Sequence, residues 1–561
     1  MIIGNSVVIK FVRSFFLVFS LLFLPWTTAS FAVEQSAVTG GPASVNNTVP
    51  GKIPEISLSD AVLKTLRANP GIFVSQEKVV QGEGLQQKAA GQFDWTIKSQ
   101  ASLDHKKTPL DSYDAKTAQT ASALANVPYN DYLQQDTNTY SLGLAKQFRS
   151  GVTVAPNVAV VDYKTNADAK VPISRSEMRI ELNVPLLRGL GSKATGADEL
   201  AAISQAKATR LLARQNIAQI IYTTSVNYWN SLAAKMSFEL TADTQARSNK
   251  LLDLVEKLVR AGLLEPAALN QAKANSLSGQ VSVSTGETDF YRSRQALALS
   301  MGMTPQELPN APNPANNFPA VIDATTLNKV NISLFIDEAL KKRGDYLAAQ
   351  TDIETARTLL SKAQNETKPK LDLGVKVGYA EEDEVSTSSR YFNSLGRNVT
   401  GLNSFVSLSL ELPIFNNAAR GNMVYRKSQV RESELIQNDL SNRIASDILT
   451  AFRALSSAIN EHQLASESEK SYKKAVEFEN QKYKAGSSTL TALIDIEDRY
   501  FRARIATIEA LRKYSVAMAQ FRLVTGTMLD AGDKTLNFDE QKLLQFPLVN
   551  QASINKDMVK K

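Results

Sequence analysis

The sequence contains no cysteine and only two histidines among its 561 residues. Without cysteine, disulfide scaffolds, thiolate metal sites and cysteine nucleophiles are excluded. His105 and His462 lie far apart, and one chain with two histidines cannot supply a His-rich zinc site. We therefore expect no catalytic residue, no metal site and no cofactor.

A strong charge imbalance is also absent. Lys and Arg exceed Asp and Glu by 63 − 56 = 7, which is too small an excess at this length to indicate nucleic-acid binding. The hydrophobic fraction of 43% and mean hydropathy of −0.20 exclude a helical membrane protein with many spans. Length alone, at roughly 150 residues per domain, predicts three or four domains.

The N-terminus has the pattern of a secretory signal. Lys10 and Arg13 precede an apolar run from Phe15 to Leu24, and small residues follow in Ser30-Phe31-Ala32. The apolar run is about ten residues long, whereas a membrane-spanning helix needs roughly 20. We therefore predict a cleaved signal peptide at 1–32. Residues 33–54 are rich in Gly, Pro, Ser and Asn, which predicts a flexible leader.

The remaining sequence is duplicated. LNVPLLRG at 182–189 matches LELPIFNN at 410–417, and KLVRAGLLEPAAL at 257–269 matches QKYKAGSSTLTAL at 481–493, in the same order. Such internal similarity indicates two copies of one structural unit. The predicted organisation is given by the following ranges: first repeat 55–302, linker 303–330, second repeat 331–526 and tail 527–561.

Each repeat begins with a helical stretch, capped in the first repeat by Asp60, and continues with strands, predicted within 95–187 and 370–413. Apolar and polar residues alternate there, as in Val406-Ser407-Leu408-Ser409, so one sheet face is apolar. A soluble sheet with one wet face gives the same pattern. Strands of about ten residues with long polar loops favour an outer-membrane barrel wall. Pro185 and Pro413 are expected to end the strands, since proline cannot donate to a ladder.

The first repeat carries additional strand-like sequence at 139–162. Residues 149–151 (Arg-Ser-Gly) fit the turn of an extra hairpin. This hairpin either enlarges a barrel or extends it outside the membrane. The segment Lys106–Asp136 is predicted to be an extracellular loop.

Long helical hairpins are predicted at 193–302 and 420–526. Residues 197–260 contain no proline and, at about 1.5 Å per residue, predict a helix on the order of 96 Å long. Breaks are expected at Gly262 and Gly486, with return helices at 266–300 and 490–524. A narrow apolar seam indicates packing against neighbouring helices; it comprises Ile444, Ile448, Phe452, Leu455 and Ile459.

The small number of strands predicted in each chain indicates that the protein assembles from several copies. Open sheet edges cannot face lipid, and a useful barrel needs eight or more strands. We therefore expect several copies of the chain to share one barrel.

These motifs resemble the outer-membrane efflux channel family, the TolC-like proteins. The resemblance covers about 55–526 and rests on the duplicated strand–Pro–helix pattern and the Ala-Gly helix breaks. It implies a mainly α fold with a membrane β-barrel: a duplicated strand pair plus long helical hairpin, assembled as a homotrimeric α-barrel/β-barrel duct. The linker 303–330 and tail 527–561 would form an equatorial belt. The family has two strands per half and no enzymatic activity.

The family also implies location and partners. The location is the outer membrane of a Gram-negative bacterium, with a large periplasmic part. The duct is passive and works with a periplasmic adaptor (membrane fusion) protein and an inner-membrane RND or ABC transporter; it contacts outer-membrane lipid and no nucleic acid. Its cargo is small molecules or proteins, exported by efflux or type I secretion.

Two sets of site residues follow from the resemblance. The adaptor-contact tips correspond to Gly262 and Leu263 in the first repeat and to Gly486 and Ser487 in the second. Each glycine also fits a plain helix C-cap.

The periplasmic gate of the family corresponds to Tyr483 and Asp495, with Glu265 as a further candidate and Glu497 and Asp498 nearby. Ser488 stands where the family has arginine, and Ala492 and Ala268 stand where it has acids. The gate network is therefore only partly present. Three copies of Asp495 would form either a cation-binding ring or three separate solvated carboxylates.

Two other function classes fit parts of the sequence less well. A periplasmic coiled-coil adaptor or envelope scaffold also has helical hairpins, but it lacks duplicated alternating strands followed by proline. An envelope hydrolase is disfavoured because acidic pairs such as Glu381-Glu382 have no base or nucleophile partner in the sequence.

Overall fold

The computed structural model describes residues 53–125, 129–166, 173–315, 317–323, 327, 331–383, 401–529 and 545–547. The predicted signal peptide, nearly all of the leader and most of the tail 527–561 lie outside these residues. The chain forms two compact units, which are described separately. The sheet unit includes Gln87–Leu200 and Thr358–Lys427, and the helical unit includes Pro50–Gln86, Ala201–Arg357 and Ser428–Lys561.

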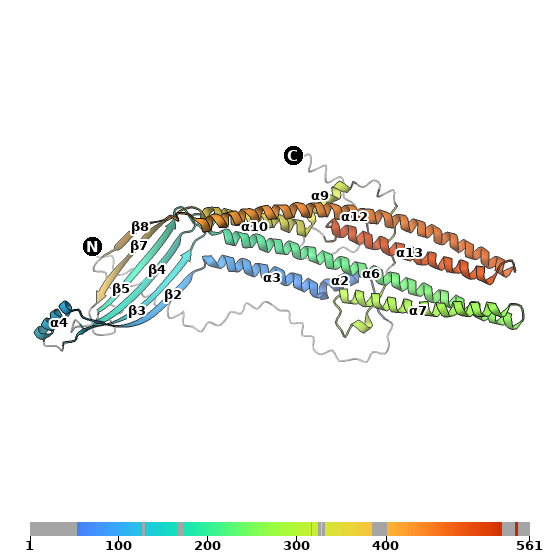
Figure 1. Ribbon diagram of the computed structural model, residues 1–561, viewed down its shortest axis with the longest axis horizontal. Helices are drawn as coiled ribbons and strands as arrows, with labels where there is room; N and C mark the ends of the chain where they lie inside the picture. The colour runs from blue at the N-terminus through green and yellow to red at the C-terminus, as the bar shows by residue number, and fades with distance from the viewer. Residues whose placement is uncertain are drawn as a thin grey trace, which may run out of the picture. The chain divides into compact units, whose positions relative to one another are not determined.

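The sheet unit contains one antiparallel sheet of six strands in the order β2-β3-β4-β5-β7-β8 (Figure 1). The first repeat supplies four strands and the second supplies two. Their bounds are β2 Thr96–Pro109, β3 Tyr132–Gln147, β4 Thr153–Thr165, β5 Ile173–Pro185, β7 Lys370–Asp383 and β8 Asn403–Glu411.

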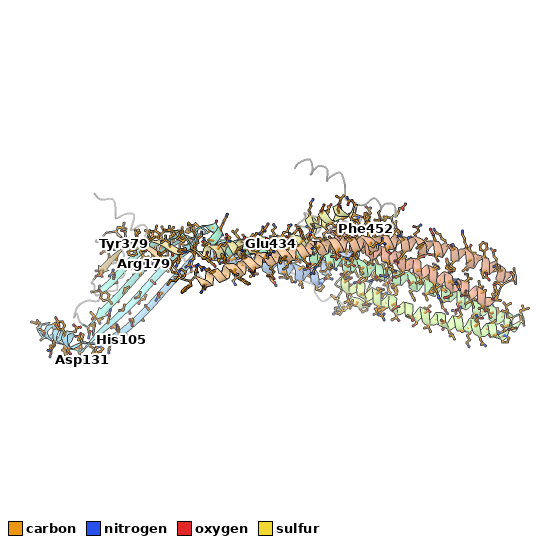
Figure 2. The ribbon with its side chains drawn as sticks, turned by 45° about the horizontal axis from the view of Figure 1, so that its top comes forward. His105, Asp131, Arg179, Tyr379, Glu434 and Phe452 are labelled. Atoms are coloured by element: carbon orange, nitrogen blue, oxygen red, sulfur yellow. The ribbon has the colours of Figure 1, made fainter. Side chains whose placement is uncertain are left out.

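The pairing register divides the sheet into an apolar and a polar face. Directly paired residues of antiparallel strands lie on the same face, and Val377 pairs with Ile180, which pairs with Pro156. Neighbouring residues in each strand point to the other face. Arg179 and Tyr379, labelled in Figure 2, therefore lie on opposite faces, since Tyr379 pairs with Met178.

The sheet corrects one prediction and extends another. Lys106–Asp136 is not a loop: β2 continues to Pro109, helix α4 occupies Ser112–Ala125, and β3 begins at Tyr132. The β2–β3 ladder continues through polar pairs such as Lys106↔Gln135, because backbone hydrogen bonds do not require apolar side chains. The alternation of apolar and polar residues therefore did not indicate this polar end of the two strands. The extra hairpin exists as β3 and β4, and it lies inside the sheet between β2 and β5.

The helical unit is built on two long hairpins, α6 with α7 and α12 with α13 (Figure 1). Their bounds are α6 Ala197–Arg260, α7 Pro266–Ser300, α12 Asn417–Lys484 and α13 Leu490–Val524. Shorter helices precede the strands of each repeat: α2 Leu58–Ala68 and α3 Pro70–Ala90 in the first, α9 Ile332–Lys342 and α10 Gly344–Glu366 in the second. The protein is thus mostly helical with a sheet, as predicted. None of the described helices has an apolar stretch long enough for a membrane span.

Helix α2 corrects the predicted cap. Its N-cap is Ser57, whose Oγ accepts the backbone N–H of Asp60 at 3.0 Å, while the Ser57 hydroxyl donates to the Asp60 carboxylate at 2.7 Å. Asp60 is therefore the third helical residue, and its backbone N–H is capped by Ser57. The observed cap lies one turn earlier than the predicted one.

Each hairpin has its own apolar core. Tyr228, Trp229 and Ile221 are buried with α2 and α7 in the first repeat. The predicted seam is buried in the second: Ile444, Ile448 and Leu455 are fully inaccessible, and they pack with Phe335 and Phe521. Described parts of the linker and tail complete these cores, because Phe318 stacks on Trp229 and Phe546 stacks on Phe521.

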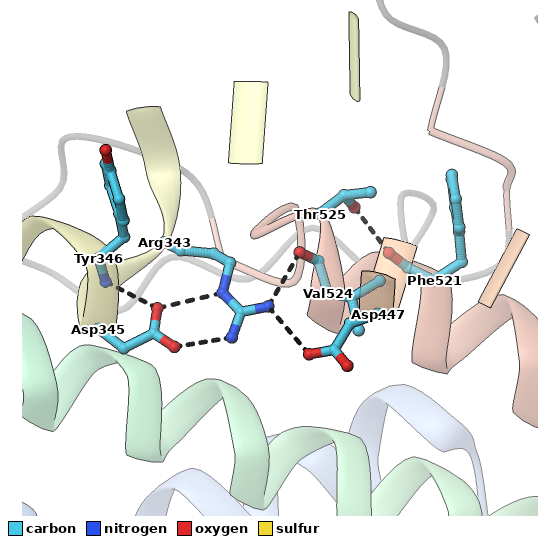
Figure 3. A network of polar contacts seen from close by, with 7 residues as sticks. All are labelled: Arg343, Asp345, Tyr346, Asp447, Phe521, Val524 and Thr525. Atoms are coloured by element: carbon cyan, nitrogen blue, oxygen red, sulfur yellow. Dashed lines mark hydrogen bonds and ion pairs between the residues drawn. The ribbon is translucent and has the colours of Figure 1, made fainter. Parts of the chain in front are cut away.

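The two repeats share one junction with different chemistry. At the end of α2, the Asn69 side-chain amide donates to the carbonyl of Ser300, at the end of α7, at 2.7 Å. At the end of α9, Arg343 donates to the carbonyl of Val524, at the end of α13, at 3.4 Å. Arg343 also forms two hydrogen bonds to the Asp345 carboxylate, at 3.1 and 2.7 Å, and its Nη1 lies 4.0 Å from the Asp447 carboxylate (Figure 3).

Candidate functional site: hairpin tips and strand junctions

Both hairpin tips turn through a glycine with the same backbone geometry. Gly262 and Gly486 each have φ of +71°, a region that favours glycine. The N–H of Leu263 donates to the carbonyl of Leu258 at 2.9 Å, and the N–H of Ser487 donates to that of Lys482 at 2.9 Å. These bonds are those of a Schellman C-cap. The glycines therefore terminate α6 and α12, whatever else they contact.

The tips present different side chains to solvent. The Leu263 side chain of the first tip is 71% exposed. Ser487 is exposed, and its hydroxyl donates to the carbonyl of Lys482 at 3.1 Å. Neither tip glycine has a heavy atom within 4 Å of the position that a Cβ would take. The space around both turns is therefore open within the described chain.

Tyr483 lies between the two hairpins. It is half-buried and packs on a cluster that includes Val255 of α6, Ala272 of α7 and Leu490 of α13. The first tip therefore contributes to holding Tyr483 in place. Sequence comparison alone placed Tyr483 near the tip but gave no indication of this packing.

The acidic candidates lie in different environments. Asp495 is exposed and forms an ion pair with Arg499 one turn later, at 2.9 Å. Glu265 is the exposed N-cap residue of α7, and its side chain makes no capping hydrogen bond. Glu497 is half-buried; burial raises the pKa of its carboxyl, and the positive charge of Arg247 opposes this shift. The acidic candidates thus have three different environments, of which only that of Glu497 is half-buried.

A polar layer inside the first hairpin was missed from the sequence. Gln245 of α6 is 8% exposed and donates to the carbonyl of Ser276 and to the Asn249 side chain, both at 3.0 Å. A Cβ on Gly279 would lie 1.8 Å from the Gln245 Oε1 atom. Gln245 and Asn249, four residues apart on a predicted core-facing helix, were the available signal.

The strand-to-helix junction has a built polar anchor. Pro185 ends β5, and Pro413 follows the end of β8 at Glu411. Close to Pro185, Arg149 of the β3–β4 turn binds both carboxylate oxygens of Glu199, with Nε–Oε2 at 2.7 Å and Nη2–Oε1 at 2.5 Å. These bonds lower the pKa of the Glu199 carboxyl. Glu199 belongs to the first turn of α6, where the helix dipole also favours a negative charge.

Within the described part of the chain, no group of three His, Cys, Asp or Glu side chains is arranged to hold a metal ion.

Comparisons with known proteins place this architecture. Residues 335–527 match the family model "Outer membrane efflux protein". The pyoverdine export outer membrane protein OpmQ of Pseudomonas putida is 23% identical over 310 residues, which are 52% of this chain and 59% of that relative.

Solved structures show the same fold. The Campylobacter jejuni CmeC outer membrane channel aligns with a TM-score of 0.61 and 15% identity over 88% of this chain and 92% of that chain. The outer membrane protein VceC of Vibrio cholerae aligns with a TM-score of 0.59 and 15% identity over 84% of this chain and 96% of that chain. The family is one of transport ducts. Residues 335–527 are thus similar to the outer membrane efflux protein family, and the chain shares its fold with these outer membrane channels.

Proposed function

We propose that this protein is the outer-membrane exit duct of a tripartite efflux or type I secretion system, passively conducting small molecules or proteins across the periplasm and outer membrane. The observation that carries the proposal is the six-stranded sheet with one apolar face, in a chain that also folds two long helical hairpins. Alternating strands of this length suit a lipid-facing wall, and the described helices offer no alternative span.

The duct is a homotrimer that shares one barrel. In the described sheet, β2 pairs with β3 alone and β8 pairs with β7 alone, so each has an edge of unpaired backbone groups. Such edges cannot face hydrocarbon. Pairing β2 of one chain with β8 of the next closes the wall. The barrel lies in the outer membrane of a Gram-negative bacterium, and the helical unit lies in the periplasm.

The hairpin tips are the docking surface for a periplasmic adaptor protein, which links the duct to an inner-membrane RND or ABC transporter. The open space around Gly262 and Gly486 and the exposed side chain of Leu263 support this assignment. A partner helix can approach the glycine backbone closely at such a turn. When the adaptor docks, the exposed Leu263 side chain packs against an apolar side chain of the partner.

The gate at the periplasmic entrance includes Tyr483, Asp495 and Glu265. The ion pair between Asp495 and Arg499 reduces the charge that three copies of Asp495 would present to a cation. We therefore favour a gate in which Tyr483 narrows the entrance and Asp495 is held by Arg499. Opening would then require the packing of Tyr483 on the first hairpin to rearrange.

The test combines location, assembly and export. Detergent extraction of outer membranes should yield a trimer that dissociates on heating.

Gly486→Trp should abolish export at an unchanged trimer level, because a bulky side chain at the tip blocks docking of the adaptor. Gly486→Ala is the matched control: it strains the cap by about 1 kcal/mol and should retain export. A soluble periplasmic monomer would instead support the adaptor or scaffold alternative, and export by Gly486→Trp would remove the tip from the docking surface.

A further inference from the structure

We propose that the β3–β4 hairpin is part of the lipid-facing wall, so that the exit barrel has 3 × 6 = 18 strands. The widened exit would pass hydrophilic cargo too broad for a barrel with four strands per chain. This inference rests on the trimeric duct proposed above and specifies the class of cargo that its exit admits.

Pairing places the hairpin within the wall. β3 pairs along the whole of β2, from Thr96↔Ala145 to Pro109↔Tyr132. β4 pairs with β5 from Thr153↔Asn183 to Tyr163↔Ile173. A hairpin extending beyond the membrane would leave β2 paired directly with β5. The sheet order β2-β3-β4-β5 shows the opposite arrangement.

The hairpin continues the apolar face at the same level as its neighbours. Ile97 of β2 pairs with Leu144 of β3, and Val158 of β4 pairs with Met178 of β5. Register puts all of these side chains on one face. The hairpin contributes seven apolar residues to this face, with Lys146 beside them opposite Val154: Tyr140, Leu142, Leu144, Val154, Pro156, Val158 and Val160. An apolar band shared by inserted and flanking strands is what a continuous lipid-facing wall requires.

The opposite face of the hairpin is uncharged, and most of its side chains at the level of the apolar band are small. The residues at this level are Thr139, Ser141, Gly143, Ala145, Ala155, Asn157, Ala159 and Val161. The same face of β5 and β7 carries a charged network instead, in which Arg179 pairs with Glu177 and Glu181, both at 2.9 Å, and Lys376 pairs with Glu181 at 3.3 Å. Small side chains on the inserted strands add lumen area without filling it.

The inner turn of the hairpin is fixed to the junction with α6. Arg149 binds Glu199 and lies 4.7 Å from the Phe93 ring centroid. The N–H of Gly191 donates to the carbonyl of Ser150 at 2.9 Å. Gly151 has φ of +95°, and a Cβ there would lie 2.2 Å from the carbonyl oxygen of Gly189. The β3–β4 turn is therefore an integral part of the junction with α6.

Strand number sets the width of the exit. With strands about 4.8 Å apart and tilted by about 40°, 18 strands give a backbone radius of about 18 Å. Twelve strands, from four per chain, give about 12 Å on the same basis. Allowing about 3 Å for side chains, the lumen widens from about 18 to about 30 Å across. An α-helix is about 10–12 Å wide, so the wider exit admits hydrophilic cargo about 20–25 Å across, such as a polypeptide with packed helices.

Cysteine chemistry can measure this width, because the chain has no native cysteine. Gln100 pairs with Ser141 on the polar face, so Gln100→Cys introduces one lumen thiol per subunit. Neighbouring thiols of the trimer should lie about 25 Å apart in an 18-stranded barrel and about 15 Å apart in a 12-stranded one. Bismaleimides of graded length, added to the purified trimer, report this distance as the shortest reagent that links subunits on a denaturing gel.

We expect reagents near 25 Å to link the full chain and reagents near 15 Å to fail. Deletion of 132–165 in the Gln100→Cys chain joins β2 to β5 and should shift the shortest effective reagent to about 15 Å. The full-chain result stands without the deletion variant if that variant does not fold. Linking of the full chain by a 15 Å reagent overturns the 18-stranded wall and leaves the duct intact.

Two controls separate this inference from the proposed function. Ala101→Cys, on the apolar face, should not react with a charged maleimide in whole cells, whereas Gln100→Cys should. Lack of reaction at Gln100→Cys in an intact trimer overturns the assignment of the faces. Absence of a trimer from the outer membrane overturns the duct itself.

PEG-maleimides of increasing size, reacted with the Gln100→Cys thiol, then test the width of cargo that the exit admits. A size limit that is equal in the full chain and in the deletion variant contradicts the role of the hairpin.

Discussion

Replacing Arg343 should loosen the junction between α9, α10 and the end of α13. The Arg343 side chain is 10% exposed and makes two bonds to Asp345, whose side chain is 22% exposed. Arg343→Ala removes these bonds and the donor to the Val524 carbonyl, and leaves a mostly buried carboxylate with one bond, from the N–H of Tyr346 at 2.9 Å (Figure 3).

The magnitude follows from this burial. Breaking a fully buried ion pair costs about 3–5 kcal/mol, and a charge-assisted bond contributes about 1.5–3 kcal/mol. Because Asp345 retains some solvent and one backbone donor, we expect a loss of about 2–3 kcal/mol. Arg357→Ala is the matched control: the Arg357 side chain is 63% exposed, its pair with Glu434 is 2.8 Å long, and an exposed pair contributes about 0–1 kcal/mol.

Hydrogen exchange of the purified protein provides the assay, because it reports local opening without requiring reversible unfolding. At about 1.4 kcal/mol per tenfold, amides at the end of α9 and the end of α13 should exchange about 30- to 150-fold faster in Arg343→Ala. In Arg357→Ala they should exchange about as in the parent. Arg343→Leu combined with Asp345→Asn should recover much of the loss, since the unpaired charge is removed. An equal effect of both single alanine substitutions would refute the reasoning.

Other perturbations test the interior of the hairpins. Gly279→Ala should lower the melting temperature, because the added Cβ would lie 1.8 Å from the Gln245 Oε1 atom and would displace this buried side chain from its bonds to Ser276 and Asn249, at a cost of about 1–3 kcal/mol. Gly286→Ala, whose Cβ would have only ordinary contacts, should raise the melting temperature slightly. Equal behaviour of the two variants contradicts this packing. Glu497→Gln should raise the melting temperature at pH 7.5 and not at pH 3.5. Burial raises the pKa of the Glu497 carboxyl in the folded chain, so the folded state favours the protonated form. The contribution of this carboxyl to stability is therefore complete below its ordinary pKa of about 4.3 and is lost as pH rises through the folded pKa. Asp498→Asn is the exposed control, and an equal gain at both pH values would rule out titration of Glu497.

The sequence determined the local elements because their signals are local. The bounds of α6 and α7 coincide with the proline-free and return stretches predicted from the sequence. The seam residues Ile444, Ile448, Leu455 and Ile459 are buried at the expected spacing, and Phe452 is half-buried. Alternation located the strands, and duplication identified two equivalent hairpins. Period and turn chemistry depend on neighbouring residues, so no tertiary information was needed.

The tertiary structure decided what depends on pairing. Sequence left the extra hairpin either inside the sheet or beyond it, and only register places β3 and β4 between β2 and β5. Likewise, nothing in the sequence joins Arg149 to Glu199, or Arg343 to Val524. These contacts bring together residues 50 and 181 positions apart, and such pairs form only because strands and helices already fixed elsewhere bring them within hydrogen-bonding distance.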